Sequence, residues 1–124
     1  MRVERRDGLT LSKWQMRDLS VLNLSDGSMW PELVARRRDK RECTVYLARE
    51  PEHARIVAWA LTYPTPNLGG HDFHVYVRDL YRREGYGTAL HRAAVADVGT
   101  VRMFAPDDTA RNFHASLDNR NRTR

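Results

Sequence analysis

Residues 73–97 read FHVYVRDLYRREGYGTALHRAAVAD, and this stretch decides the fold. Its first five residues, Phe73 to Val77, are mostly aromatic or β-branched, which is typical of a β-strand. The alanine-rich residues from Thr88 to Asp97 favour a helix. A strand, a turn with two glycines and then a helix form the setting that a phosphate-binding backbone loop requires.

The turn contains Gly85 and Gly87. Glycine has no Cβ, so the backbone can take left-handed angles there and can approach a ligand closely. The first amides of the following helix have no intrahelical partner, and the helix dipole adds positive charge beside them. Arg82 and Arg83 bring formal charge to the same place. These features favour a pyrophosphate site over an ordinary glycine-containing turn.

Two well-known phosphate loops do not fit. A Walker loop needs Gly-Lys-Ser or Gly-Lys-Thr, and a dinucleotide fingerprint needs a third glycine where Leu90 stands. The pattern R-x-x-G-x-G after a strand that ends in Val77 resembles the acetyl-coenzyme A signature of the GNAT superfamily of N-acetyltransferases. The resemblance implies a mixed α+β fold of the acyl-CoA N-acyltransferase type. It would have a mainly antiparallel sheet of about five strands and about four helices, in a single domain over residues 1–124.

The resemblance also implies acetyl-CoA as the cosubstrate. In that family the backbone at the end of the strand pairs with the pantetheine arm, and the loop amides hold the pyrophosphate. By this correspondence the pantetheine is expected to lie against Val75, Tyr76 and Val77. The pyrophosphate is expected to lie against Arg82, Arg83, Glu84, Gly85, Tyr86, Gly87 and Thr88. The amide of Val77 would also polarise the thioester carbonyl.

The remaining elements follow the order of that fold. We expect strands at residues 2–5, 44–49, 55–62, 73–77 and 101–105. We expect helices at about 12–24, from Pro31 onward, at 88–97 and at 107–118. Ser12 and Gln15 form a capping box for the first helix. The prolines and glycines of residues 63–70 predict an irregular connection.

Acetyl transfer needs a proton acceptor for the amine and a proton donor for the leaving thiolate. A tyrosine of the last helix is the proposed donor in the family, and His114 stands in its place here; a solvated surface histidine is the alternative. For the acceptor we expect His71 first and Asp72 second, with His74 nearby. Alternation along a strand puts His71 and Asp72 on opposite faces, so only one of them can face the acceptor.

No metal is expected, because His71, His74 and His114 lack a supporting cysteine or carboxylate pattern. The net charge is +5 and nearly all of the positive charge is arginine. The densest basic cluster, residues 36–41, is expected to be a solvated helix end, where cations are favourable for structural reasons alone. Nucleic-acid binding is therefore the weakest of the functions considered.

The composition, 41% hydrophobic and 30% charged residues in a chain of 124, is ordinary for a globular protein. There is no apolar run of about 20 residues and no apolar signal core, so we expect no membrane span and a cytoplasmic location. Cys43 is the single cysteine, which excludes an internal disulfide.

Family members usually continue into two more strands, whereas residues 119–124 are polar and end the sequence. This difference keeps a catalytically silent structural or interaction protein open as an alternative to an N-acetyltransferase acting on a small molecule or a protein. It also suggests that a second copy or another protein covers the exposed edge of the sheet.

Overall fold

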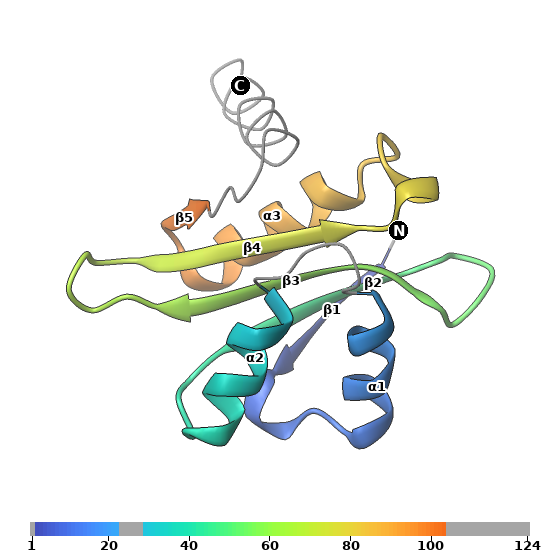
Figure 1. The fold of residues 1–124 in the computed structure, drawn as a ribbon. Coiled ribbons are helices and arrows are strands. Elements are labelled where there is room, and N and C mark those ends of the chain that lie inside the picture. Colours follow the sequence, from blue (N-terminus) through green and yellow to red (C-terminus); the bar gives the residue numbers. More distant parts are fainter. Residues whose placement is uncertain (1, 23–28, 104–124) are drawn as a thin grey trace, which may run out of the picture.

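The computed structural model describes residues 2–22 and 29–103 (Figure 1). The elements, in chain order, are β1 (Arg2–Asp7), the 3₁₀ turn η1 (Gly8–Thr10), α1 (Lys13–Leu22), α2 (Met29–Arg38), β2 (Thr44–Arg49), β3 (Ile56–Pro64), β4 (His71–Val77), the 3₁₀ turn η2 (Asp79–Tyr81), α3 (Tyr86–Val98) and β5 (Val101–Met103).

The five strands form one sheet in the order β1-β2-β3-β4-β5. Neighbours from β1 to β4 are antiparallel, and β5 runs parallel to β4. β3 pairs with the whole of β4, from Ala58 opposite Val77 to Pro64 opposite His71, whereas the described residues of β5 pair only with His71–Phe73. The mixed α+β fold with a mainly antiparallel five-stranded sheet is therefore as predicted.

Two hydrophobic layers hold the helices to the sheet. α1 and α2 cover one face and α3 covers the other (Figure 1). β3 is buried on both faces, because Trp59 and Leu61 pack under α1 and α2 while Ala58 and Ala60 pack under α3. Small residues on the α3 side let that helix approach the sheet closely.

The capping box predicted for the first helix is present. The Ser12 amide donates to Gln15 Oε1 at 2.9 Å, and the Gln15 amide donates to Ser12 Oγ at 3.1 Å. Both orphan amides at the start of α1 are thereby satisfied. Pro31 lies in the first turn of α2, where its missing N–H costs no helical hydrogen bond.

Several boundaries differ from the prediction: β1 ends at Asp7 rather than at residue 5, β4 begins at His71 rather than at residue 73, and α3 begins at Tyr86 rather than at residue 88. The end of β3 differs most in its consequences. β3 continues through Tyr63 and Pro64, which we had assigned to the irregular connection. Tyr63 is buried in the core, and a proline is tolerated at the end of a strand. The connection itself is residues 65–70, where Gly69 and Gly70 have φ of 72° and 76°. The helix expected at 107–118, residues 104–105 of the last strand and residues 23–24 of the first helix lie outside the described residues.

The arginines at the end of α2 are a second correction. Arg36 is buried; its Nε donates to Glu32 at 2.9 Å, one terminal nitrogen donates to the Glu42 carbonyl at 3.1 Å, and its Cζ lies 3.6 Å from the centre of the Tyr63 ring. Arg37 donates to the Gly8 carbonyl at 2.6 Å. Two arginines of this run therefore fasten α2 to its neighbours, and they do not form a solvated helix end.

Candidate functional site

The backbone of β4 has a side that faces away from β3. The Arg78 amide donates to the Val57 carbonyl of β3 at 3.0 Å, whereas the His71 amide donates toward β5, to Thr100, at 3.2 Å. Because amide directions alternate along a strand, the amides of Val75 and Val77 point the same way as that of His71. We call the backbone of Val75 and Val77 on this side the open edge of β4. Within residues 2–22 and 29–103, no strand pairs with it.

The glycine loop follows at the end of this edge. Gly85 is the N-cap of α3 and has a φ of 88°, which glycine adopts without a steric cost. The helical ladder begins with the Ala89 amide, which donates to the Gly85 carbonyl at 3.0 Å. The earlier amides of this turn, those of Tyr86 and Gly87, therefore lie at the positive end of the helix dipole. The loop therefore presents backbone amides in the arrangement that an anion site requires.

Two arginines flank the loop in different ways. Arg82 donates from Nε to the Val77 carbonyl at 3.2 Å and pairs with Asp79 at 3.0 Å, so it fastens the loop to the end of the strand. Arg83 is exposed and has a φ of 67°, an uncommon conformation for a residue with a side chain. Backbone outliers of this kind concentrate at binding loops.

Tyr86 contributes to the loop through its backbone. Its side chain is buried beneath α3, with its ring edge-on to that of Tyr81 at a centroid distance of 5.9 Å. This packing anchors the start of the helix. The carboxylate of Glu84 and the guanidinium of Arg83 are on the exposed side of the turn.

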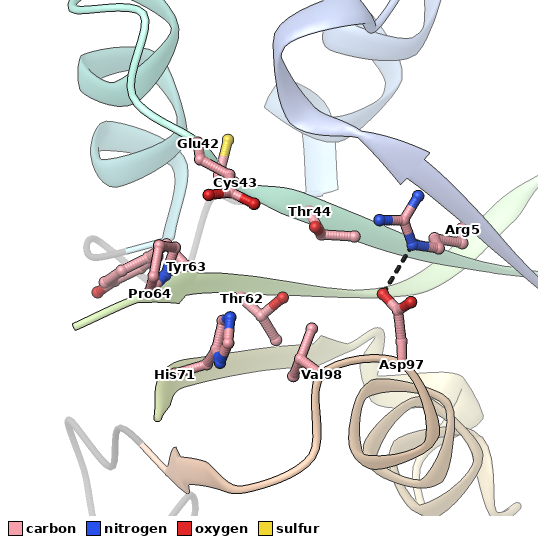
Figure 2. A pocket seen from close by; sticks show the side chains of 10 residues that line it. All are labelled: Arg5, Glu42, Cys43, Thr44, Thr62, Tyr63, Pro64, His71, Asp97 and Val98. Carbon is pink, nitrogen blue, oxygen red and sulfur yellow. Dashed lines mark hydrogen bonds and ion pairs between the residues drawn. The ribbon is translucent and has the colours of Figure 1, made fainter. Parts of the chain in front are cut away.

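His71 lies in a separate pocket at the other end of α3. Figure 2 shows this pocket, of about 340 Å³, with His71, Thr44 and Thr62 on the sheet side and Asp97 at the end of the helix. α3 has 13 residues, so at a rise of about 1.5 Å per residue the pocket lies roughly 18 Å along the helix from the glycine loop. His71 is therefore far from the anion site.

Asp97 is the best-connected charge of this pocket. Its Oδ2 accepts from Arg5 Nε and from the Tyr46 hydroxyl, both at 2.7 Å (Figure 2 shows the ion pair with Arg5). The hydrogen bond from Arg5 is the main cause that lowers the pKa of Asp97. Burial is the main cause that raises the pKa of Tyr46. The three side chains join β1, β2 and the end of α3.

Asp72 and His74 lie on the opposite face, toward α1 and α2. Asp72 stands directly across the strand pair from Tyr63 and forms an ion pair with Arg102 at 3.4 Å. His74 is buried, and its Nε2 lies 2.8 Å from the Tyr63 hydroxyl. His71 and Asp72 are thus kept apart by the sheet, as alternation predicted, and the structure does not bring them together in one site.

Tyr63 was missed from the sequence because it was assigned to a loop. The alternation of Trp59 and Leu61, continued by two residues, would have placed it on the buried face of the strand. His114 lies outside the described residues. Among the residues that the structure describes, there is no group of three or more histidine, cysteine or acidic side chains placed to hold a metal ion, and no helix is long and apolar enough to cross a membrane.

Comparison with protein families gives one match. Residues 10–118 match the model described as Acetyltransferase (GNAT) family. No curated protein sequence is similar enough to this chain to count as a match.

Solved structures provide a second comparison. Ribosomal-protein-alanine N-acetyltransferase from Brucella melitensis biovar Abortus 2308 is 15% identical, with a TM-score of 0.61 over 94% of this chain and 91% of that one. AAC(6')-Iy, solved with the bisubstrate analogue CoA-S-monomethyl-acetylneamine, is 13% identical, with a TM-score of 0.60 over 94% and 90%. An aminoglycoside acetyltransferase, meta-AAC0020, from an uncultured soil metagenomic sample was solved with sisomicin; it is 20% identical, with a TM-score of 0.62 over 94% and 86%. At these identities the likeness is one of fold.

Proposed function

Because this chain belongs to the acetyltransferase (GNAT) family, we propose that it transfers an acetyl group from acetyl-CoA to an amine of a small molecule or a protein. The observation that carries the proposal is the open edge of β4, which leads directly to the helix N-terminus at Gly85. Together they offer an extended hydrogen-bonding edge and an anion site at its end. A pantetheine arm joined to a pyrophosphate has the same two parts in the same order.

The described residues fit this cosubstrate. The amides of Val75 and Val77 and the carbonyl of Val75 suit the amide groups of pantetheine, since an extended chain can pair with a strand edge, whereas the Val77 carbonyl already accepts from Arg82. The amides from Gly85 to Gly87, with the charge of Arg83, suit the pyrophosphate. The buried side chain of Tyr86 and the clamp from Arg82 hold the loop in shape. Glu84 and Thr88 complete the same turn.

The transfer itself requires few groups. The amine nitrogen attacks the thioester carbonyl, the new C–N bond forms, and the C–S bond breaks with its electron pair going to sulfur. We assign the Val77 amide to polarise the carbonyl, and His114 to return a proton to the thiolate. Of the two acceptors expected from the sequence we retain Asp72. His71 is the poorer candidate, because its pocket lies on the side of α3 and far from the glycine loop.

The other functions have less support. Two cations of the basic cluster are not available to a nucleic acid, because Arg36 and Arg37 form hydrogen bonds inside the fold. We propose a cytoplasmic location, in line with a single cysteine. We also propose that a second copy or another protein covers the edge of the sheet where family members usually have two more strands. Sedimentation as a strict monomer would count against this.

A proline at position 77 tests the proposal. The Val77 amide points to the open edge and donates no hydrogen bond to β3, so Val77→Pro removes the amide without removing a ladder bond. Val77→Ala is the matched control, since it trims the same side chain and keeps the amide. Binding of acetyl-CoA is measured by calorimetry and by the shift in melting temperature.

We expect millimolar acetyl-CoA to raise the melting temperature of the wild type and of Val77→Ala, because a ligand at about 100 times its Kd adds roughly 2.7 kcal/mol of stability. Val77→Pro should bind at least tenfold more weakly. If acetyl-CoA at about 1 mM leaves the melting temperature of the wild type unchanged, the proposal is refuted. Equal binding by the proline and alanine variants refutes the assignment of the open edge.

A further inference from the structure

The pocket at the C-terminal end of α3 is used by neither the open edge nor the glycine loop. Its volume of about 340 Å³ is at the lower end of the range for small-molecule sites, about 300–1,000 Å³. It lies at the opposite end of the helix from the proposed pyrophosphate site. The pocket is therefore a candidate for a second, smaller ligand.

The α3 face of the sheet changes character at this pocket. In its middle the face is apolar, with Ala58 and Ala60 of β3 buried under the helix. At the pocket it is polar: Thr44 lies directly across the strand pair from Thr62, and His71 follows on β4. Figure 2 shows these three side chains along the sheet side of the pocket. Apolar side chains would serve better if this wall had only to pack, because a buried hydroxyl is costly unless it is hydrogen-bonded.

Two polar atoms of this wall have no hydrogen-bond partner among the described residues. They are Thr62 Oγ1 and His71 Nδ1, and both atoms are buried. The Thr62 residue is only 1% exposed. The neighbouring Tyr46 hydroxyl donates its single proton to Asp97 at 2.7 Å, and therefore none to Thr62. Because buried polar atoms are normally paired, these two are suited to a bound molecule with hydrogen-bonding groups.

The end of α3 gives the pocket a negative potential. The Gly99 amide takes the Val95 carbonyl at 2.9 Å, and the carbonyls of the next three residues lie at the negative end of the helix dipole. The last turn of α3 has no basic residue. Instead it carries the carboxylate of Asp97, at a place where negative charge is unfavourable for the helix. This arrangement favours the binding of a cation over the stability of the helix.

The charged side chains of the lining agree with a cation. They are one guanidinium, that of Arg5, and two carboxylates, those of Glu42 and Asp97. Arg5 and Tyr46 both donate to Asp97 Oδ2, so Oδ1 accepts no hydrogen bond from a described residue. The side chain of Asp97 is 28% exposed and that of Arg5 is 56% exposed, so a ligand can reach the carboxylate. A phosphate would instead meet two carboxylates and the negative end of a helix.

We propose that this pocket binds a small organic cation, in which a primary ammonium group has hydroxyl groups beside it. The ammonium donates to Asp97 Oδ1 and to the carbonyls of the last turn of α3. The hydroxyl groups pair with Thr62 Oγ1 and His71 Nδ1. α3 then has an anion site at its first turn and a cation site at its last, each matched to the sign of the helix dipole.

Binding is measured by ¹H–¹⁵N correlation spectra of the full chain, titrated with ethanolamine, glucosamine, ethylene glycol or inorganic phosphate. We expect both amines to shift the amide signals of Thr62, His71 and Val98 saturably, with Kd values below about 10 mM. Ethylene glycol, which has hydroxyl groups and no charge, should bind at least about tenfold more weakly. Shifts confined to Val75, Val77 and the glycine loop overturn the inference. Saturable shifts at the pocket with phosphate alone, or none there with either amine, also overturn it.

Two variants test the assigned contacts. Asp97→Asn removes the charge, and Thr62→Val replaces the hydroxyl by a methyl group of similar shape. We expect each to weaken both amines about tenfold. Asp18→Asn, which removes an exposed carboxylate from α1, is the matched control and should leave the affinity unchanged. Thr62→Val keeps the ion pair of Arg5 and Asp97, so it tests the site even if Asp97→Asn unfolds the protein. Wild-type affinity in both variants overturns the inference. None of these measurements involves acetyl-CoA, so their outcome is independent of the proposed function.

Discussion

The turn after β1 leaves no room for a side chain at Gly8. A Cβ at this position would lie 2.2 Å from Cys43 Sγ and 3.0 Å from the Cys43 carbonyl oxygen. Nonbonded heavy atoms prefer about 3.5–4.0 Å, so the methyl group of Gly8→Ala would overlap the sulfur by more than an ångström. Cys43 is itself buried, and the Gly8 amide donates to its carbonyl at 2.8 Å, so neither residue can move aside alone. Overpacking of this kind costs about 1–3 kcal/mol.

The melting temperature measures this cost. For a chain of this size about 1 kcal/mol corresponds to roughly 3–5 °C, so a cost of about 1–3 kcal/mol should lower the melting temperature of Gly8→Ala by roughly 3–15 °C. Cys43→Ala removes the sulfur and should partly restore Gly8→Ala, because the two changes act on one contact. The carbonyl remains close, so the rescue is incomplete. A Gly8→Ala melting temperature within about 2 °C of the wild type, or strictly additive effects in the double variant, would refute the reasoning.

Three further predictions concern ionisation and backbone strain. Burial raises the pKa of Tyr63 to about 12, so its contribution to stability is complete below about pH 10 and is lost as the pH rises through the folded value. Tyr63→Phe should therefore flatten the fall in melting temperature between about pH 10 and 12. The hydrogen bond from Arg5 lowers the pKa of Asp97, so this contribution is present above the ordinary carboxyl pKa and is lost as the pH falls; Asp97→Asn should flatten the acid limb, and an unchanged acid limb would contradict the pairing. Arg83→Gly should raise the melting temperature slightly, because glycine adopts a φ of 67° without strain. It should also weaken the binding of acetyl-CoA severalfold, because a cation is removed. Calorimetry with Arg83→Lys, which keeps the charge, separates the effect of charge from that of strain.

Local signals predicted much of the fold. The capping box of Ser12 and Gln15, the strand before the glycine loop and the left-handed Gly85 all follow from a few neighbouring residues, and the structure confirms them. Pro64 misled the prediction, since proline usually interrupts a strand and here it merely ends one. Local patterns cannot show that Pro64 stays in the strand because it pairs with His71 of β4.

The site was harder to predict because it depends on register. The alternation of side chains along the strand correctly placed His71 and Asp72 on opposite faces of the sheet. It does not show which face lies on the side of the glycine loop and which face is left for an acceptor. The contact between Tyr63 and His74 requires the exact alignment of β3 and β4. Likewise Arg36 and Arg37 become internal only because η1 and Glu42 lie beside the end of α2. These are long-range facts that a run of residues does not contain.

The outer edge at β1 and the open edge of β4 differ in charge, and this difference matters for handling the protein. The outer strand β1 carries several charged residues, among them Glu4, Arg5 and Arg6. Charges on an edge strand oppose the pairing of another strand with that side of the sheet. The open edge at Val75 and Val77 lacks such charges and, among the described strands, has no neighbour. A cosubstrate that occupies it would serve as a cap against self-association. Purification and storage with coenzyme A should therefore slow aggregation, and the benefit should be greatest at high protein concentration.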